Sequence, residues 1–334
     1  MRKASYWEAK PDDVVLCLLC PQYCNIKPGK VGVCRARKNV AGELVSLNYG
    51  EITSFALDPI EKKPLYHFCP GSDILSVGTK GCNLSCGFCQ NWHISQADTE
   101  THSITSKALA EVVANYGRKG ESIGLSYTYS EPLIWFEFVL ETARLVHEKG
   151  SKNVLVTNGH INENPLRELL PYIDAMNVDV KAFSPLFYAK VCSGKLEPVL
   201  RTARLAREAG CHIEITNLII PGLNDAEDEV GKLVDWVAQT LGDTTPLHFS
   251  RYYPAYKFKQ PPTPIATLRR AAEIAGEKLK YVYLGNVPGK EGADTVCYEC
   301  GKTVIERTVF GVAEIHVRDA KCGYCGAPIH IIQT

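Results

Sequence analysis

The sequence predicts an α/β protein built around a parallel sheet, and three observations lead to that class. Between residues 72 and 290, short β-branched apolar runs alternate with segments whose apolar residues recur at steps of three and four. This alternation is typical of parallel strands joined by right-handed helical crossovers. The chain has 334 residues, 45% of them hydrophobic and 22% charged, which is an ordinary globular composition. No fixed internal period is present, so a repeat solenoid is excluded.

The elements are expected in strict alternation. The predicted strands are Ile74–Thr79, Ser122–Ser126, Asn153–Thr157, Ala175–Val180, His212–Ile220, Leu247–Ser250 and Tyr281–Leu284. The predicted helices are Ser106–Arg118, Ile134–Lys149, Glu163–Leu170, Glu197–Ala209, Ala226–Thr240 and Pro264–Lys278. The pattern is compatible with an open doubly wound sheet and with a full or partial barrel. In either arrangement the active site lies at the carboxyl ends of the strands.

Charge and cysteine content narrow the function classes. The formal net charge is zero, so the protein has no excess of positive charge that would favour binding to a nucleic acid or an anionic membrane. The apolar stretch Val14–Leu19 is too short for a leader or a membrane span, and we therefore expect a cytoplasmic protein. A reducing compartment does not maintain structural disulfides, so fourteen cysteines indicate metal or redox chemistry.

A central cysteine motif follows the first predicted strand. Residues Lys80–His93 read K-G-C-N-L-S-C-G-F-C-Q-N-W-H, which places Cys82, Cys86 and Cys89 at x3 and x2 spacing in one loop. Thiolates are the usual ligands of iron–sulfur clusters. Three sulfurs leave one iron of a cuboidal cluster with open positions, and an open metal site binds substrate. The alternative is a zinc knuckle that borrows Cys69 or His93 as a fourth ligand.

This motif, with Phe88 before the last cysteine, resembles the radical S-adenosylmethionine (SAM) superfamily. The resemblance implies a [4Fe–4S] cluster on Cys82, Cys86 and Cys89 whose free iron chelates SAM. It further implies reductive cleavage of SAM to a 5′-deoxyadenosyl radical, which abstracts hydrogen from a substrate. A protein donor such as ferredoxin or flavodoxin is then the expected reductant.

Polar residues stand at the ends of later strands, where the superfamily places SAM contacts. The resemblance implies cofactor-binding roles for Glu131, Thr157, Asn158, Asp179, Lys181, Asn217 and His248. Glu131 lies in Thr-Tyr-Ser-Glu-Pro, where many relatives have Gly-Gly-Glu-Pro. Each role has a structural alternative: a helix-terminal carboxylate for Glu131, an ion pair for Asp179 and Lys181, and simple hydrogen bonding for His248.

Segments across the chain resemble one subgroup, the AmmeMemoRadiSam system radical SAM enzymes, which are relatives of pyruvate formate-lyase activating enzymes. These segments include Cys17–Pro21, Asp58–His67, Cys89–Trp92, Tyr127–Pro132 and His248–Pro254. The resemblance implies a partial (β/α)6 radical SAM barrel over 72–290. A cysteine-rich N-terminal extension is expected over 1–71 and a metal-binding C-terminal extension over 291–334. It also makes Memo-like and AMMECR-like proteins candidate partners.

Two further cysteine groups lie in these extensions. Cys297, Cys300, Cys322 and Cys325 form two CxxC knuckles, which is typical of a zinc-ribbon or rubredoxin-like site. Structural Zn²⁺ is favoured there, and a single iron is the alternative. Cys17, Cys20, Cys24 and Cys34 form a second possible four-thiolate site, for which zinc is slightly favoured over an auxiliary cluster.

The leading functional hypothesis is a SAM-cleaving oxidoreductase acting on an unidentified substrate. One version activates a partner by making a glycyl radical, and a second version modifies a small molecule or a partner protein directly. The whole-chain resemblance favours the second version. A rival of another class is a non-catalytic zinc-binding interaction module.

Overall fold

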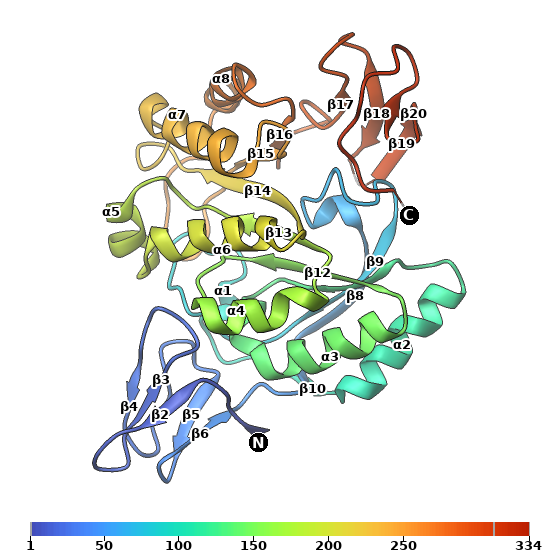
Figure 1. Ribbon diagram of the computed structural model, residues 1–334. Helices are drawn as coiled ribbons and strands as arrows, with labels where there is room; N and C mark the ends of the chain where they lie inside the picture. The colour runs from blue at the N-terminus through green and yellow to red at the C-terminus, as the bar shows by residue number, and fades with distance from the viewer. Residues whose placement is uncertain (1, 310, 334) are drawn as a thin grey trace.

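The computed structural model describes residues 2–309 and 311–333, and an eight-stranded sheet forms its centre (Figure 1). The strand order is β16-β15-β14-β13-β12-β11-β9-β8; seven strands run parallel, and β8 pairs antiparallel with β9. The strands are β8 (Ser54–Pro59), β9 (Asp73–Gly78), β11 (Gly124–Tyr127), β12 (Lys152–Thr157), β13 (Ala175–Asp179), β14 (His212–Ile219), β15 (Leu247–Arg251) and β16 (Val282–Gly285). The prediction of an α/β protein with a parallel sheet is confirmed.

Six long helices connect the parallel strands close to the predicted positions. They are α2 (Ser106–Arg118), α3 (Phe136–Glu148), α4 (Glu163–Leu169), α6 (Leu196–Glu208), α7 (Glu227–Trp236) and α8 (Ile265–Gly276). Local chemistry sets their starts: the Thr105 hydroxyl accepts a hydrogen bond from the Ala108 amide before α2, and α7 carries three acidic residues in its first turn. Two short helices, α1 (Trp92–Ser95) and α5 (Pro185–Phe187), lie in loops near the sheet edge.

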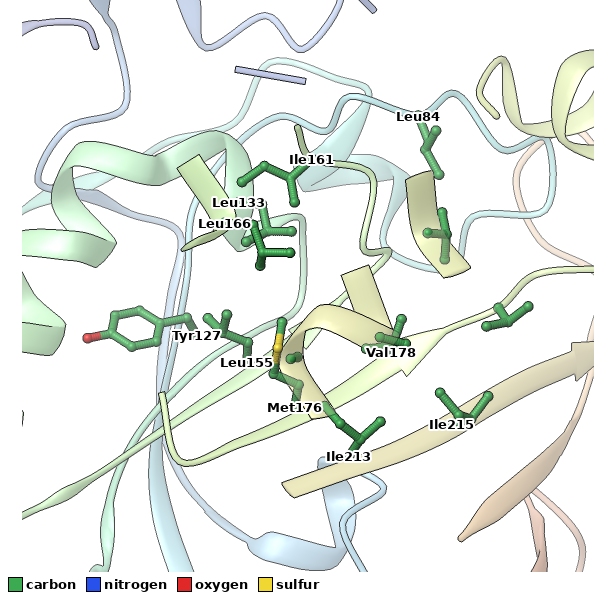
Figure 2. Close-up of a cluster of buried hydrophobic side chains, with 14 of the residues drawn as sticks. Leu84, Tyr127, Leu133, Leu155, Ile161, Leu166, Met176, Val178, Ile213 and Ile215 are labelled. Carbon is green, nitrogen blue, oxygen red and sulfur yellow. The ribbon is translucent and has the colours of Figure 1, made fainter. Parts of the chain in front are cut away.

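One face of the sheet is apolar and packs against the helices. Figure 2 shows Tyr127, Leu155 and Val178 from successive strands gathered in one cluster with Leu166 of α4. Each of these side chains is no more than 1% exposed. Burial of a side chain of this size contributes about 1.5–3 kcal/mol, so this layer is the main source of stability.

The opposite face of the sheet is unusually polar. Asn177 pairs in register with Glu214, and Thr216 pairs with His248. Glu214 is fully buried and accepts four hydrogen bonds, from the amides of Tyr66 and His67 and from the rings of His212 and His248. The segment that follows β8 therefore covers this face through backbone contacts.

The remaining strands form small sheets at the two ends of the chain. On the N-terminal side they are β1 (Arg2–Lys3), β2 (Trp7–Ala9), β3 (Val15–Cys17), β4 (Asn25–Ile26), β5 (Arg37–Val40), β6 (Glu43–Ser46), β7 (Glu51–Ile52) and β10 (His102–Ser103). On the C-terminal side they are β17 (Thr295–Val296), β18 (Thr303–Thr308), β19 (Gly311–Ile315), β20 (Val317–Arg318) and β21 (Lys321–Cys322).

The small sheets contact the central sheet directly. Residues 54–59, expected in the N-terminal extension, form β8 at the edge of the large sheet instead. Buried Arg307 of β18 donates a 2.7 Å hydrogen bond to the carbonyl oxygen of Tyr66, which joins the C-terminal sheet to the polar face. Within residues 2–309 and 311–333, every helix falls short of the length and apolar character that a membrane crossing requires.

Candidate active site

A cavity of about 500 Å³ opens at the carboxyl ends of the parallel strands. The loop after β9 contributes all three central cysteines to its wall, and every later strand contributes at least one polar group in or just after the strand. These groups include Glu131 after β11, Thr157 and Asn158 at the end of β12, Asp179 and Lys181 after β13, Thr216 of β14, Ser250 of β15 and Asn286 after β16. The cavity thus lies at the carboxyl ends of the strands, where the sequence predicts the active site.

The cysteine loop is held by contacts that leave no room for larger side chains. Gly81 has a φ of +92°, and a Cβ there would lie 2.3 Å from the carbonyl oxygen of Cys34. Phe88 is 3% exposed and packs against Phe258 at 5.9 Å between ring centroids. Glycine and an aromatic anchor therefore fix the path of the backbone that carries the sulfurs.

The three sulfurs stand apart rather than converging on one point. Within the described ranges, only the four C-terminal cysteines approach closely enough to share a single ion. The Cys82 sulfur accepts a hydrogen bond from the Leu84 amide at 3.4 Å, and the Cys89 sulfur lies 3.3 Å from the Ser95 hydroxyl. Burial raises the pKa of Cys82 well above its ordinary value, so metal binding would be coupled to proton release.

A fourth thiol lies beside this loop. Cys192 is fully buried and lies beside Cys86, and its proximity together with burial raises the pKa of Cys86 well above its usual range. The Cys192 carbonyl also accepts the Ser85 amide at 2.8 Å. Cys192 does not line the cavity, so it lies behind Cys86. The spacing of the central motif gives no sign of Cys192, which lies 103 positions after Cys89 in the sequence.

Glu131 ties three strand ends together. Its Oε1 accepts hydrogen bonds from the Leu133 amide at 2.9 Å and the Thr157 hydroxyl at 2.6 Å, and its Oε2 accepts the Asn158 amide at 2.8 Å. The carboxyl group is 2% exposed, and burial raises its pKa to about 7 despite these donors. Asn158 in turn lies 3.5 Å from the Cys82 sulfur, so Glu131 positions the cysteine loop indirectly.

Asp179 and Lys181 face the cavity as an ion pair with a 2.7 Å separation. Burial alone would lower the pKa of Lys181, but the Asp179 carboxylate raises it above its ordinary value. The pair retains access to the cavity, since the side chains are 29% and 17% exposed. The structure is thus compatible with both a structural ion pair and a ligand contact at these residues.

Two predicted cofactor-binding residues lie outside the cavity wall. Asn217 is 3% exposed and donates to the carbonyl oxygen of Val180 at 2.8 Å, whereas its neighbour Thr216 lines the cavity. His248 is also 3% exposed, and its Nε2 lies 2.6 Å from Glu214 below the cavity. Because successive strand residues face opposite sides, Thr216 and not Asn217 faces the cavity, and the cofactor-binding role of Asn217 stays a prediction.

Several residues that line the cavity were not predicted from the sequence. Asp58 accepts hydrogen bonds from Lys63, at 2.7 Å, and from the Tyr129 hydroxyl, and all three residues line the cavity. Tyr129 has a φ of +68° and its carbonyl accepts the Asn91 side chain at 2.7 Å. Asp58 and Lys63 both belong to the quoted Asp58–His67 segment, and both are buried, so each charge requires a partner.

The C-terminal cysteines form a compact four-sulfur set. Their Sγ atoms all lie within 4.8 Å of one another, with 3.7 Å between Cys297 and Cys325 and 3.8 Å between Cys300 and Cys322. Metal–sulfur bonds of about 2.3 Å place tetrahedral sulfurs about 3.8 Å apart. This group can hold one metal ion.

Comparisons with known proteins agree with this geometry. The family described as "Radical SAM superfamily" matches residues 76–237, which contain the three central cysteines. The chain is 44% identical over 339 residues to "Uncharacterized protein MJ0808" of Methanocaldococcus jannaschii, covering 99% of this chain and all of that protein.

More distant similarities extend to named enzymes. The chain is 23% identical over 192 residues to the pyruvate formate-lyase-activating enzyme of Streptococcus mutans, covering 55% of this chain and 72% of that one. Its fold is similar to that of Streptococcus suis SuiB bound to S-adenosylmethionine, with a TM-score of 0.53 and 16% identity over 69% of this chain and 54% of the other.

Proposed function

Because the chain belongs to the radical SAM superfamily, we propose that it cleaves SAM at the cavity beside Cys82, Cys86 and Cys89. The superfamily implies a [4Fe–4S] cluster and SAM as cofactors. When bound, the two supply one-electron cleavage of SAM to methionine and a 5′-deoxyadenosyl radical that takes a hydrogen atom from a substrate. We further propose that the sheet with its six strand–helix units is the partial (β/α)6 barrel of the superfamily.

One observation carries the proposal: three separated cysteine sulfurs border a cavity whose other walls carry polar and charged groups. The sulfurs are too far apart to share one ion, which fits a cuboidal cluster better than zinc. Glu131 and Asp179 offer carboxylates to a ligand ammonium, and Lys63 and Lys181 offer cations to its carboxylate. The predicted SAM roles of Asn217 and His248 stay predictions, since neither side chain lines the cavity.

The test is an anaerobic assay of reconstituted protein with SAM and dithionite. We expect a brown protein that forms 5′-deoxyadenosine and methionine in equal amounts. A colourless protein that contains only zinc and leaves SAM intact would instead support the non-catalytic zinc-binding module.

The pH dependence of SAM binding tests the role of Glu131. A carboxylate attracts the SAM ammonium only when ionised, and burial raises the pKa of Glu131 to about 7. We therefore expect SAM affinity to fall by up to about tenfold per pH unit below pH 7. Glu131→Gln should bind SAM at least about tenfold more weakly, with little pH dependence between pH 6 and 8. The exposed carboxylate of Glu163 provides the control: Glu163→Gln should keep the wild-type profile, whereas an unchanged profile in Glu131→Gln would exclude this role.

For the reaction itself, direct modification of a small molecule or partner protein is the favoured version. The resemblance to AmmeMemoRadiSam system enzymes supports it and makes Memo-like and AMMECR-like proteins the proposed partners. Glycyl-radical activation is the second candidate, and the similarity to a pyruvate formate-lyase-activating enzyme supports it. Ferredoxin or flavodoxin is the proposed electron donor in both versions. We also propose Zn²⁺ as the metal of the compact C-terminal cysteine group.

A further inference from the structure

Four cysteines near the N-terminus surround an enclosed cavity that is separate from the proposed active site. Cys17, Cys20 and Cys34 are each at most 8% exposed, and Cys24 is half-buried. The side chains enclose only a small space, with a volume of about 10 Å³. The spacing of these cysteines in the sequence suits either zinc or a cluster, with zinc slightly favoured. We propose that they bind a second [4Fe–4S] cluster instead.

The separation of the sulfurs is the first argument. A single tetrahedral ion draws four sulfurs to about 3.8 Å from one another, whereas a cuboidal cluster holds them roughly 6 Å apart. The C-terminal four meet the first condition. Among the described residues, no other set of cysteines is compact enough to bind a single ion. The N-terminal four and the central three both fail this condition. The N-terminal cysteines therefore resemble the set to which the superfamily assigns a cluster.

The surroundings suit a buried anionic cluster. Backbone amides of Gln22, Val33 and Ala36 lie beside the sulfurs of Cys20, Cys24 and Cys34, respectively, and each opposes the rise in thiol pKa that burial causes. Amide N–H groups beside sulfurs stabilise thiolates and tune cluster potentials.

A buried cation borders the same space. Arg37 is 1% exposed, lines the cavity and retains an Nε without a hydrogen-bond partner. Its guanidinium also pairs with Glu137 at 2.5 Å, which fixes it beside the cysteines. A fixed positive charge next to the sulfurs offsets the negative charge that four thiolates bring.

The position of the cavity indicates what such a cluster does. The Asn83 side chain lies beside Cys20 and lines the same cavity, and Asn83 immediately follows Cys82 of the central loop. Gln22 donates to the Asn83 carbonyl at 2.8 Å, which locks the two loops together. Four protein ligands leave no open iron for a substrate, so the role is electron transfer. The cluster would accept one electron from a ferredoxin- or flavodoxin-type donor and pass it to the central site, and no bond is made or broken. This electron-transfer role rests on the proposed function, whereas the presence of the cluster does not.

The experiment compares metal content after anaerobic reconstitution. Wild-type protein should hold about eight irons per chain, plus one zinc at the C-terminal group. A triple variant with Cys82, Cys86 and Cys89 replaced by alanine should keep about four irons and four sulfides, and a cluster signal in electron paramagnetic resonance after reduction. A double variant, Cys24→Ser with Cys34→Ser, should also drop to about four irons, while Cys211→Ala, at a buried cysteine outside the groups, should keep about eight.

Two results would overturn the proposal: a triple variant that is colourless and carries two zinc ions, or a double variant with unchanged iron. Circular dichroism matching wild type establishes that each variant is folded. Wild-type protein that holds about four irons and cleaves SAM would sink this inference and leave the proposed function intact. Wild-type protein that holds only about four irons, all of which the triple variant keeps, would support the N-terminal cluster and sink the proposed function.

Discussion

Replacing Cys86 with alanine is expected to abolish SAM cleavage, lowering 5′-deoxyadenosine formation at least about a thousandfold, or about 4 kcal/mol of barrier. Cys86 is 8% exposed and supplies one of the three sulfurs on the cavity wall. Two remaining sulfurs cannot hold a cuboidal cluster in a fixed position, so about four irons per chain should be lost with the activity. Iron analysis and product quantification by chromatography on the same samples measure both effects.

Cys192→Ala is the matched control, because Cys192 is a buried cysteine in direct contact with Cys86. It does not line the cavity, so its loss should leave the central irons in place and change SAM cleavage by less than about tenfold. The opposite pattern, with iron lost in Cys192→Ala and kept in Cys86→Ala, would mean that Cys192 is a cluster ligand. The cluster would then have no open iron for SAM, and the proposed chemistry would fail.

The sheet and its helices were predictable because each element carries a strong local signal. Val154 to Val156 is a continuous apolar run, and Ala175 to Val180 is apolar except at Asn177 and Asp179, as expected for buried parallel strands. The cysteine loop was predictable for a related reason, since three ligands within eight residues must lie close together in space. The edge at which the site lies then followed from the topology.

Contacts between segments that are distant in the sequence could not be predicted, because no local sequence pattern marks them. The pairing of Cys192 with Cys86 depends on how a one-turn helix folds back on the central loop, and spacing does not encode that. The sequence also did not show that Thr216, and not Asn217, faces the cavity, because a strand buried on both faces shows no alternation of polar and apolar residues. The contact of Asp58 with Tyr129 left no signal either, because 71 residues separate the two.

Glu214→Gln is expected to produce the largest loss of stability, about 3–5 kcal/mol in the free energy of unfolding and about 10 °C in Tm. Glu214 is fully buried and both of its oxygens accept two hydrogen bonds. A glutamine directs an amide N–H₂ group at donors that need an acceptor, and each buried donor left unsatisfied costs about 1–3 kcal/mol. Urea unfolding of both proteins at neutral pH measures the difference.

The pH dependence of that difference identifies its cause. Burial alone would raise the pKa of Glu214, but hydrogen bonds from His212 and His248 hold it well below its ordinary value of 4.5. A carboxyl group with a lowered folded-state pKa stabilises the protein above the unfolded pKa, and this contribution is lost as the pH falls toward the folded-state value. The gap between wild type and Glu214→Gln should therefore be largest near neutral pH and shrink below pH 4.5.

Glu197→Gln provides the comparison, because the Glu197 side chain is 76% exposed and pairs with Arg201 at the surface. Exposed ion pairs contribute about 0–1 kcal/mol, so this variant should unfold almost as wild type does at every pH. If Glu214→Gln were equally stable, the four hydrogen bonds would contribute little. The polar face would then be held by other contacts, such as the packing of Phe68 and the hydrogen bonds from Asn177 to the Pro64 carbonyl and from Arg307 to the Tyr66 carbonyl.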